Sequence, residues 1–267
     1  MPFIKLDGTR IHYRFDTPLG GPADAPVVVF SNSLGTNLSM WDLQVPSLTA
    51  HFRVLRYDTR GLGLSSVTPG PYANEQLARD VVRLLDALGI ERAHFCGLSM
   101  GGMAGMWLGA YALGRVDRLV LCDTAPRIGS AEFWRGRISS VLEGGMVTIT
   151  EAVLERWFTP AFMSRAPEAV EQTRQMLLQS PPEGYVACCA AVRDTDETQT
   201  LDRIRARTLV ITGRHDPATP PADGRYIAGK VPGAHYVELE ASHLSNIEAA
   251  PEFNQALLGF LTSPESN

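Results

Sequence analysis

The sequence predicts an α/β fold in which a mostly parallel sheet is flanked by helices. Short apolar runs typical of buried strands alternate with helical stretches, which favours parallel strands joined by crossover helices. The run Pro-Val-Val-Val-Phe at 26–30 has the continuous apolar character of a strand that is buried on both faces. A Gly-Leu-Ser-Met-Gly pentapeptide at 97–101 lies where another such strand passes into a helix. With 267 residues, 45% of them hydrophobic and 20% charged, the chain can form one large domain with an insertion.

Charge and composition exclude several classes of partner. The net charge is −5 and no cluster of Lys and Arg stands out, so we expect no nucleic-acid partner. No apolar run reaches the length of a membrane span, and we expect no membrane partner. Residues 1–8 lack the pattern of a signal peptide. None of the four cysteines has C-x-x-C spacing, which predicts reduced, buried thiols in a cytoplasmic protein. Nothing in the sequence assigns an oligomeric state.

The first half of the chain contains four expected strands and a helix. Strands at 3–6 and 10–15 flank Asp7-Gly8-Thr9 as a hairpin, and a Gly/Pro-rich loop follows at 19–22. Further strands are expected at 26–30 and 52–57. Apolar residues at 77, 81, 84, 85 and 88 form one stripe of a helix over 74–89, with Asn74 as its N-cap and Gly89 as its stop.

The second half predicts an inserted cap. Strands are expected at 92–96, 118–122, 207–212 and 235–239, and an apolar helix at 102–110. The stretch 126–195 contains no convincing strand but has helical pieces at 133–142, 150–158, 167–178 and 184–192. It could be a set of ordinary crossover helices, yet a crossover needs only a dozen or so residues. We therefore expect a core of residues 1–125 and 196–267 with a helical cap at 126–195.

The pentapeptide predicts a catalytic serine. It fits the pattern G-x-S-x-G, and its place between a strand and a helix is the context in which that pattern is informative. A turn this sharp strains the backbone of Ser99 and requires small neighbours, which Gly97 and Gly101 provide. The alternative is a helix N-cap serine without chemistry.

A serine hydroxyl needs a base, and His243 is the best candidate among six histidines. It follows the last strand, and loops at the carboxyl ends of parallel strands are where this architecture places active sites. Asp216 follows the strand at 207–212 and is expected to orient the imidazole. The resulting order of Ser, Asp and His along the chain matches the α/β-hydrolase arrangement. Asp123, which also ends a strand, is the rival carboxylate.

The developing oxyanion needs two backbone N–H donors. One is expected from Met100, the residue after the serine, and the other from Leu34 in the loop after the first apolar strand.

Together these segments resemble the α/β-hydrolase family. Residues 57–65, Tyr-Asp-Thr-Arg-Gly-Leu-Gly-Leu-Ser, are similar to its D-x-R-G-x-G-x-S segment. Within the family the chain most resembles 3-oxoadipate enol-lactonases of the β-ketoadipate pathway of aromatic catabolism. The segments that carry this resemblance are 31–36, 40–42, 123–129 with Trp134 and Arg137, 193–196, 219–221 and 241–248.

The resemblance implies hydrolysis of a small-molecule lactone, 3-oxoadipate enol-lactone, with no cofactor and no metal. The substrate carries a carboxylate, so a basic group of the cap should meet it. Arg127, Arg135, Arg137 and Arg193 are candidates, and Trp134 is expected to form a pocket wall or part of the cap's own core.

Two alternatives stay open at this point. One is another carboxylesterase, lactonase or perhydrolase with the same triad. The other is a receptor of hydrolase fold that binds a small ligand without turnover, since a fold does not fix a function.

Overall fold

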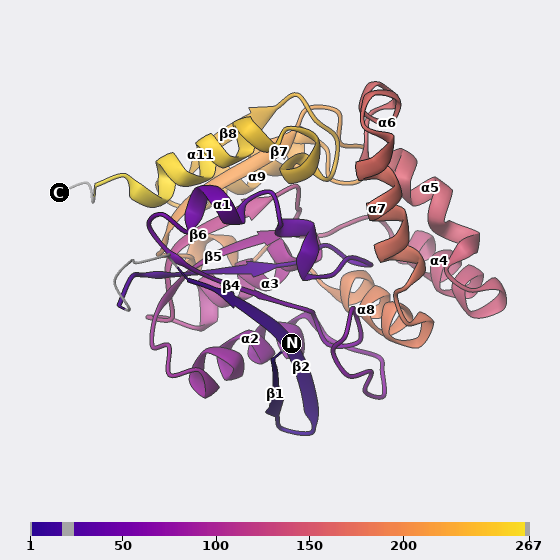
Figure 1. The fold of residues 1–267 in the computed structure, drawn as a ribbon, viewed down its shortest axis with the longest axis horizontal. Helices are drawn as coiled ribbons and strands as arrows, with labels where there is room; N and C mark the ends of the chain where they lie inside the picture. Colours follow the sequence, from indigo (N-terminus) through magenta and orange to yellow (C-terminus); the bar gives the residue numbers. More distant parts are fainter. Residues whose placement is uncertain (1, 18–23, 265–267) are drawn as a thin grey trace.

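The computed structural model describes residues 2–17 and 24–264. Its strands are β1 (Phe3–Leu6), β2 (Thr9–Asp16), β3 (Val27–Ser31), β4 (Arg53–Tyr57), β5 (Ala93–Leu98), β6 (Val116–Cys122), β7 (Arg207–Gly213) and β8 (His235–Leu239). They form one sheet in the order β1-β2-β4-β3-β5-β6-β7-β8 (Figure 1). The pairs β1–β2 and β2–β4 are antiparallel and the other five are parallel, which confirms the mostly parallel sheet.

The chain opens with the expected hairpin. Leu6 pairs with Thr9 across a two-residue turn, in which Asp7 has φ 28° and Gly8 has φ 84°. Positive φ at both central positions gives the turn a twist that matches the flanking strands. The Gly/Pro-rich loop expected at 19–22 lies outside the described residues.

Helices lie on both faces of the sheet. The core helices are α1 (Val45–Leu48), α2 (Asn74–Ala87), α3 (Met100–Tyr111), α9 (Pro221–Lys230), α10 (Ser245–Glu248) and α11 (Ala250–Thr262), with 3-10 turns η1 (Leu38–Trp41) and η2 (Leu201–Arg203). Alternate residues of β3 point to opposite faces: Val28 and Phe30 join a core with α1 and α11, and Val27 and Val29 join a core with α2, α3 and α9. Burial on both faces explains the unbroken apolar run of this strand.

Helix α2 follows its predicted stripe but begins differently. Leu77, Val81 and Leu84 are buried, and Gly89 follows the helix with φ 67°, as the stop signal predicts. The N-cap prediction is wrong, because Asn74 is already helical. Its buried side chain instead donates to the Met103 carbonyl oxygen at 3.0 Å and to Glu197 Oε1 at 2.8 Å. These tertiary partners outweigh the local preference of asparagine for a cap.

Five helices fill the chain between β6 and β7. They are α4 (Ala131–Gly144), α5 (Val147–Trp157), α6 (Pro160–Arg165), α7 (Pro167–Leu178) and α8 (Pro182–Asp194), and we call them the cap. They gather at the right of the molecule in Figure 1. Helix α6 is too short to show periodicity in the sequence. Helix α9 was also not predicted, because Pro220, Gly224 and Gly229 resemble a loop, whereas Ile227 is fully buried and packs the helix onto the sheet.

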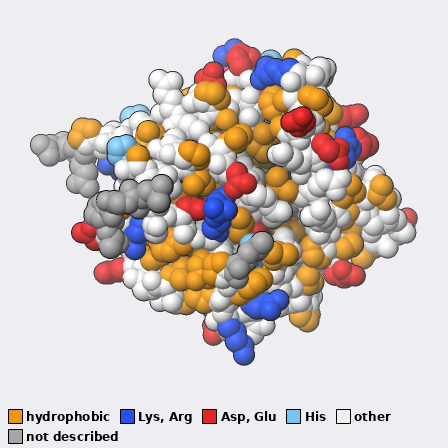
Figure 2. Space-filling view, viewed as in Figure 1, with side chains coloured by type: hydrophobic (Ala, Val, Ile, Leu, Met, Phe, Trp, Pro, Cys, Tyr) orange, Lys and Arg blue, Asp and Glu red, His pale blue; other side chains and the backbone are white. Residues whose placement is uncertain are grey.

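The surface and the cysteine environments are ordinary for a globular protein. Acidic and basic side chains are scattered over the described part of the face in Figure 2, without a continuous basic field. Within residues 2–17 and 24–264, no helix is both long and apolar enough to cross a membrane. All four cysteines are free and buried.

Candidate active site

Ser99 occupies a strained turn between β5 and α3. Its backbone has φ 56° and ψ −114°, a combination that an L-residue adopts only when its surroundings enforce it. The Ser99 amide donates to the Cys122 carbonyl oxygen at 2.9 Å, and the Thr124 hydroxyl donates to the Ser99 carbonyl oxygen at 2.8 Å. A Cβ atom on Gly97 would overlap the Gly101 carbonyl, and one on Gly101 would overlap the Ser31 carbonyl. Both glycines are therefore needed sterically, as the sequence predicts.

His243 and Asp216 form a buried pair in the loops after β8 and β7. The distance from His243 Nδ1 to Asp216 Oδ2 is 2.7 Å, and the two residues are 2% and 3% exposed. The Thr219 hydroxyl donates to Asp216 Oδ2 at 2.6 Å, and the amides of Ala218 and Thr219 donate to Asp216 Oδ1. Burial alone would raise the pKa of Asp216, but the His243 imidazole and the donors from Thr219 lower it below its usual value. Asp216 is therefore ionised, and its hydrogen bond orients the imidazole.

Asp123, the rival carboxylate, makes no contact with the imidazole. It is fully buried at the end of β6, where its Oδ1 accepts from the Gly213 amide at 2.6 Å and its Oδ2 accepts from the Ser245 hydroxyl at 2.5 Å. Burial, and then the charge of Asp216, raises the pKa of Asp123 well above its usual range. Asp123 thus links the loop that carries Asp216 with the loop that carries His243.

The loop after β3 lies against the turn that holds Ser99. The carbonyl oxygen of Asn32 accepts from the Gly101 amide at 3.1 Å. The side chain of Asn32 is held at both ends, since its Nδ2 donates to the Tyr57 carbonyl oxygen at 2.8 Å and its Oδ1 accepts from Trp41 Nε1 at 2.9 Å. No hydrogen bond to a described residue uses the amide of Leu34 or Met100. Both N–H groups expected to bind the oxyanion are available for a ligand.

Ser99 and His243 face one cavity beneath the cap. It is also lined by Ser33 and Leu34, and by cap residues that include Trp134, Arg137 and Arg156. No hydrogen bond joins the Ser99 and His243 side chains in this structure; such contacts commonly tighten only when substrate binds. The cavity measures about 40 Å³, and Ser99 is only 7% exposed there.

Only one of the four candidate arginines lines this cavity. Arg127 and Arg135 are exposed on the cap, and Arg193 is paired with Asp194 at 2.6 Å. Arg137 does line the cavity. Its guanidinium lies 4.8 Å from the Phe133 ring centroid, and its Nη1 is 3.4 Å from the Tyr185 hydroxyl oxygen.

Arg156 is a second cavity arginine that sequence reasoning missed. Its guanidinium lies 5.1 Å from the centroid of the same Phe133 ring. Burial, and then the like charge of Arg137, lowers the pKa of Arg156. Neither Arg137 nor Arg156 forms an ion pair with a described carboxylate. In the sequence, Arg156 stands beside Trp157 near the end of the helix expected at 150–158. Periodicity does not indicate whether a residue at such a position faces a cavity.

Trp134 forms a wall of the cavity, in agreement with one of its two expected roles. Its Nε1 donates to the Ile128 carbonyl oxygen at 2.7 Å, which fixes the indole plane and leaves it without a polar group free for chemistry. Among the described residues, no group of three or more His, Cys, Asp or Glu side chains is arranged to hold a metal ion.

Comparison with known proteins identifies the family. The family model described as the alpha/beta hydrolase fold matches residues 26–250. The chain belongs to the α/β-hydrolase family. It is 44% identical over 237 residues to 3-oxoadipate enol-lactonase 2 of Acinetobacter baylyi, with 89% of each chain covered.

Solved structures of other α/β hydrolases are also similar to this chain. The enol-lactonase from Burkholderia xenovorans LB400 is 48% identical with a TM-score of 0.96, covering 98% of this chain and 100% of that one. A thermophilic esterase from Thermogutta terrifontis, solved with malate bound, is 28% identical with a TM-score of 0.89, covering 97% and 96%. The family and fold expected from the sequence are therefore confirmed.

Proposed function

We propose that this chain is a serine hydrolase that opens 3-oxoadipate enol-lactone to 3-oxoadipate, with Ser99 as nucleophile, His243 as base and Asp216 as orienting carboxylate. Two enol-lactonases among its relatives support the substrate. The strained serine and the buried His243–Asp216 pair support the reaction class. In this proposal residues 126–195 are a cap over a core of residues 1–125 and 196–267, and the enzyme works in the cytoplasm.

One observation carries the choice of substrate: two arginines without a carboxylate partner line the same cavity as Ser99. Two adjacent half-buried cations are unfavourable, because each is partly desolvated and they repel one another. An anionic ligand removes that cost and gains charge-assisted hydrogen bonds. The enol-lactone has its reacting carbonyl and its carboxylate at separate places, so Arg137 and Arg156 can hold the carboxylate while Ser99 meets the carbonyl. The malate bound to the similar Thermogutta esterase is an anionic ligand of the same chemical kind.

In the first half of the reaction the lactone acylates the enzyme. His243 Nε2 takes the proton of the Ser99 hydroxyl, and Oγ attacks the carbonyl carbon. The amides of Leu34 and Met100 donate to the oxyanion, and each such donor typically contributes about 3 kcal/mol to the transition state. When the tetrahedral intermediate collapses, the ring C–O bond breaks. The leaving enolate takes the proton from His243 and tautomerises to the ketone.

In the second half, water releases the product. His243 removes a proton from water, and the resulting hydroxide attacks the acyl carbon. The Ser99 ester bond then breaks, and the proton returns to Oγ. Throughout both halves Asp216 stays ionised, because its three donors and the imidazole stabilise its charge.

The size of the cavity adds a conformational step. With a volume of about 40 Å³ the cavity is narrow, so we expect the cap to move when the lactone enters. Phe133, which contacts both arginines and is 37% exposed, lines the same cavity.

The proposal is tested by following the loss of enol-lactone absorbance with freshly prepared 3-oxoadipate enol-lactone. Wild type should turn over the lactone efficiently, and Ser99→Ala should lose almost all activity. An acyl group trapped on Ser99 would support the covalent step. A wild type that hydrolyses p-nitrophenyl acetate but not the lactone would retain the triad and overturn the substrate assignment.

The carboxylate site has its own test. Arg137→Met and Arg156→Met should each lower kcat/KM for the lactone about 10- to 100-fold, because each removes a charged hydrogen bond of about 1.5–3 kcal/mol. Hydrolysis of the neutral ester p-nitrophenyl acetate should change less than about threefold. Arg193→Met is the matched control, since this arginine is paired with Asp194 outside the cavity. Equal losses on both substrates would contradict a role in binding the carboxylate.

A further inference from the structure

Glu248 is a buried carboxylate that the reaction above does not use. It ends the short helix α10, five positions after His243, and is 6% exposed. No described Lys, Arg or His forms an ion pair with its side chain. Its two oxygens instead accept hydrogen bonds, and the origin of the donors is informative.

The donors come from two separate parts of the molecule. From the core, the Ser242 amide donates to Glu248 Oε2 at 3.0 Å. From the cap, the Thr159 amide donates to Oε2 at 3.2 Å, and the Thr159 hydroxyl donates to Oε1. Thr159 is the N-cap of α6, and its hydroxyl oxygen also accepts from the Phe162 amide. One carboxylate thus joins the residue before the catalytic histidine to the cap.

Backbone hydrogen bonds reinforce this connection on both sides of the histidine. The Ser242 hydroxyl donates to the carbonyl oxygen of Arg156 at 2.9 Å. The Leu244 amide donates to the carbonyl oxygen of Trp157 at 3.1 Å. His243 therefore lies between two residues that are both bonded to the cap segment that carries the Arg156 guanidinium.

We propose that Glu248 is a positioning residue that holds the His243 loop at a fixed position relative to the Arg156–Thr159 segment of the cap. The base and the substrate-binding arginine are then set as a unit relative to Ser99. The part concerning Arg156 rests on the proposed function; the part concerning His243 needs only the triad. A small displacement of such groups lowers the rate strongly, because proton transfer and binding both depend on close geometry.

Glu248→Gln tests the proposal with almost no change in size. It removes the charge and replaces one acceptor oxygen with an NH2 group, so the hydrogen bonds that the Ser242 amide and Thr159 donate to Glu248 are weakened. In the folded variant, kcat for p-nitrophenyl acetate should fall at least tenfold with little change in KM. For the lactone, kcat/KM should fall at least a further threefold, since Arg156 is displaced too. If the variant loses only thermal stability, and folded protein stays within twofold of wild type on both substrates, the proposal is overturned.

Thr159→Val and Thr159→Ser test the contact between Glu248 and the cap separately from the contact between Glu248 and Ser242. Valine removes the hydroxyl contact to Oε1, while the Thr159 and Ser242 amides still donate to Oε2. One cap hydrogen bond to Glu248 then remains instead of two, so KM for the lactone should rise at least fivefold and kcat for the neutral ester should stay within twofold. Serine keeps the hydroxyl and should match wild type. If Glu248→Gln does not fold, an unchanged lactone KM in Thr159→Val overturns the link to the cap. If wild type does not act on the lactone, the proposed function fails, while the neutral-ester result with Glu248→Gln still decides the link to His243.

Discussion

Two buried carboxylates follow the neighbouring strands β6 and β7, and their surroundings shift their pKa values in opposite directions. Asp216 has the His243 imidazole and several hydrogen-bond donors as partners, and these lower its pKa despite its burial. Burial, and then the charge of Asp216, raises the pKa of Asp123, and the donors from Gly213 and Ser245 do not offset this. This difference separates the two carboxylates by role: Asp216 is suited to stabilise an imidazolium ion, and Asp123 is suited to hold loops together.

Substitution by asparagine should therefore have unequal effects on activity. Asp216→Asn should lower kcat by about 10³- to 10⁴-fold, because the amide favours the wrong tautomer of the imidazole. Asp123→Asn should lower kcat less than about tenfold, since Asp123 does not touch His243. Steady-state kinetics on a neutral ester measures both. A loss in Asp123→Asn as large as that in Asp216→Asn would make Asp123 part of the catalytic unit.

The pH dependence of stability should also change in Asp123→Asn. A folded-state pKa raised above the unfolded value near 4 means that the contribution of Asp123 to stability is fully present below about pH 4 and is lost as pH rises towards the folded pKa. Asparagine lacks this titration, so the variant should gain up to about 1.4 kcal/mol relative to wild type for each pH unit in that window. Urea unfolding at several pH values measures the difference. A difference that does not vary with pH would show that Asp123 titrates normally.

At the same scale, the sequence could predict Ser99, Asp216 and His243 as the candidate triad, but it could not predict that Arg156 lines the same cavity as Ser99 and His243. Ser99, Asp216 and His243 each occupy a position that local context marks: a strand-to-helix turn, or a loop directly after a strand. Arg156 lies on a helix, and its direction depends on how α5 packs against the core. Asn32 lies in the loop that also carries Leu34, and its contacts with Tyr57 and Trp41 were not predictable because they are tertiary.

At the scale of elements, helix α4 presents Trp134 and Arg137 to the cavity, so its start should matter for binding. Ser130 is its N-cap and accepts from the Phe133 amide at 3.1 Å. Ser130→Ala should cost about 1 kcal/mol of stability, and KM for the lactone should rise by up to about fivefold. Neutral-ester hydrolysis should be unchanged.

Ser140→Ala is a matched control on the same helix. Ser140 lies on the exposed face and its hydroxyl donates only to the Gly136 carbonyl oxygen one turn earlier, so alanine should be neutral there. Thermal unfolding and lactone kinetics compare the two variants. Indistinguishable results would mean that the start of α4 does not position the cavity residues.

Elements were predictable where one physical signal dominates. Buried parallel strands and the stripe of α2 are set by apolar periodicity, which is local in the sequence. The start of α2, the short helix α6 and the glycine-containing helix α9 depend on partners far along the chain, such as Glu197 for Asn74. Periodicity contains no information about those partners.

At the scale of the whole molecule, the sheet order brings distant loops to one edge. Strands β3, β5, β6, β7 and β8 are parallel neighbours, so the loops after them meet at their carboxyl ends. The sequence predicts this meeting from the fold class alone. The hydrogen bonds that hold the early and late parts of the chain together were not predictable.

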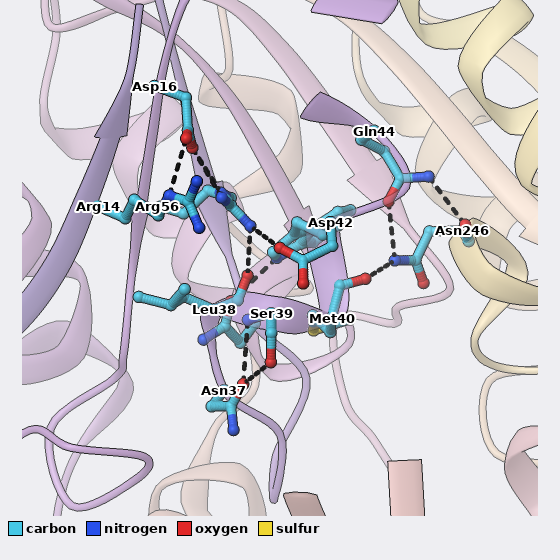
Figure 3. A network of polar contacts seen from close by, with 12 residues as sticks. Arg14, Asp16, Asn37, Leu38, Ser39, Met40, Asp42, Gln44, Arg56 and Asn246 are labelled. Atoms are coloured by element: carbon cyan, nitrogen blue, oxygen red, sulfur yellow. Dashed lines mark hydrogen bonds and ion pairs between the residues drawn. The ribbon is translucent and has the colours of Figure 1, made fainter. Parts of the chain in front are cut away.

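One such network joins η1 to the C-terminal helices (Figure 3). Asn246 is fully buried, and its Nδ2 donates to the Met40 carbonyl oxygen at 2.8 Å and to Gln44 Oε1 at 3.3 Å. Gln44 Nε2 in turn donates to the Asn246 carbonyl oxygen at 2.8 Å and to Asn254 Oδ1 at 2.9 Å. Residues about 200 positions apart thereby fix the loop after β3 against the loop that contains His243.

Asn246→Asp should destabilise the molecule in a pH-dependent way. The carboxylate would face two acceptor oxygens in a buried site, at a cost of about 3–5 kcal/mol when ionised. Its folded pKa should therefore lie above the unfolded value near 4; the variant should be closest to wild type below about pH 4, where the protonated acid can donate to Met40, and should lose stability as pH rises. Asn254→Asp is the control, because that side chain is only half-buried and should change the free energy of unfolding far less. Urea unfolding at pH 4, 6 and 8 compares the two, and equal, pH-independent losses would show that the network does not join the ends of the fold.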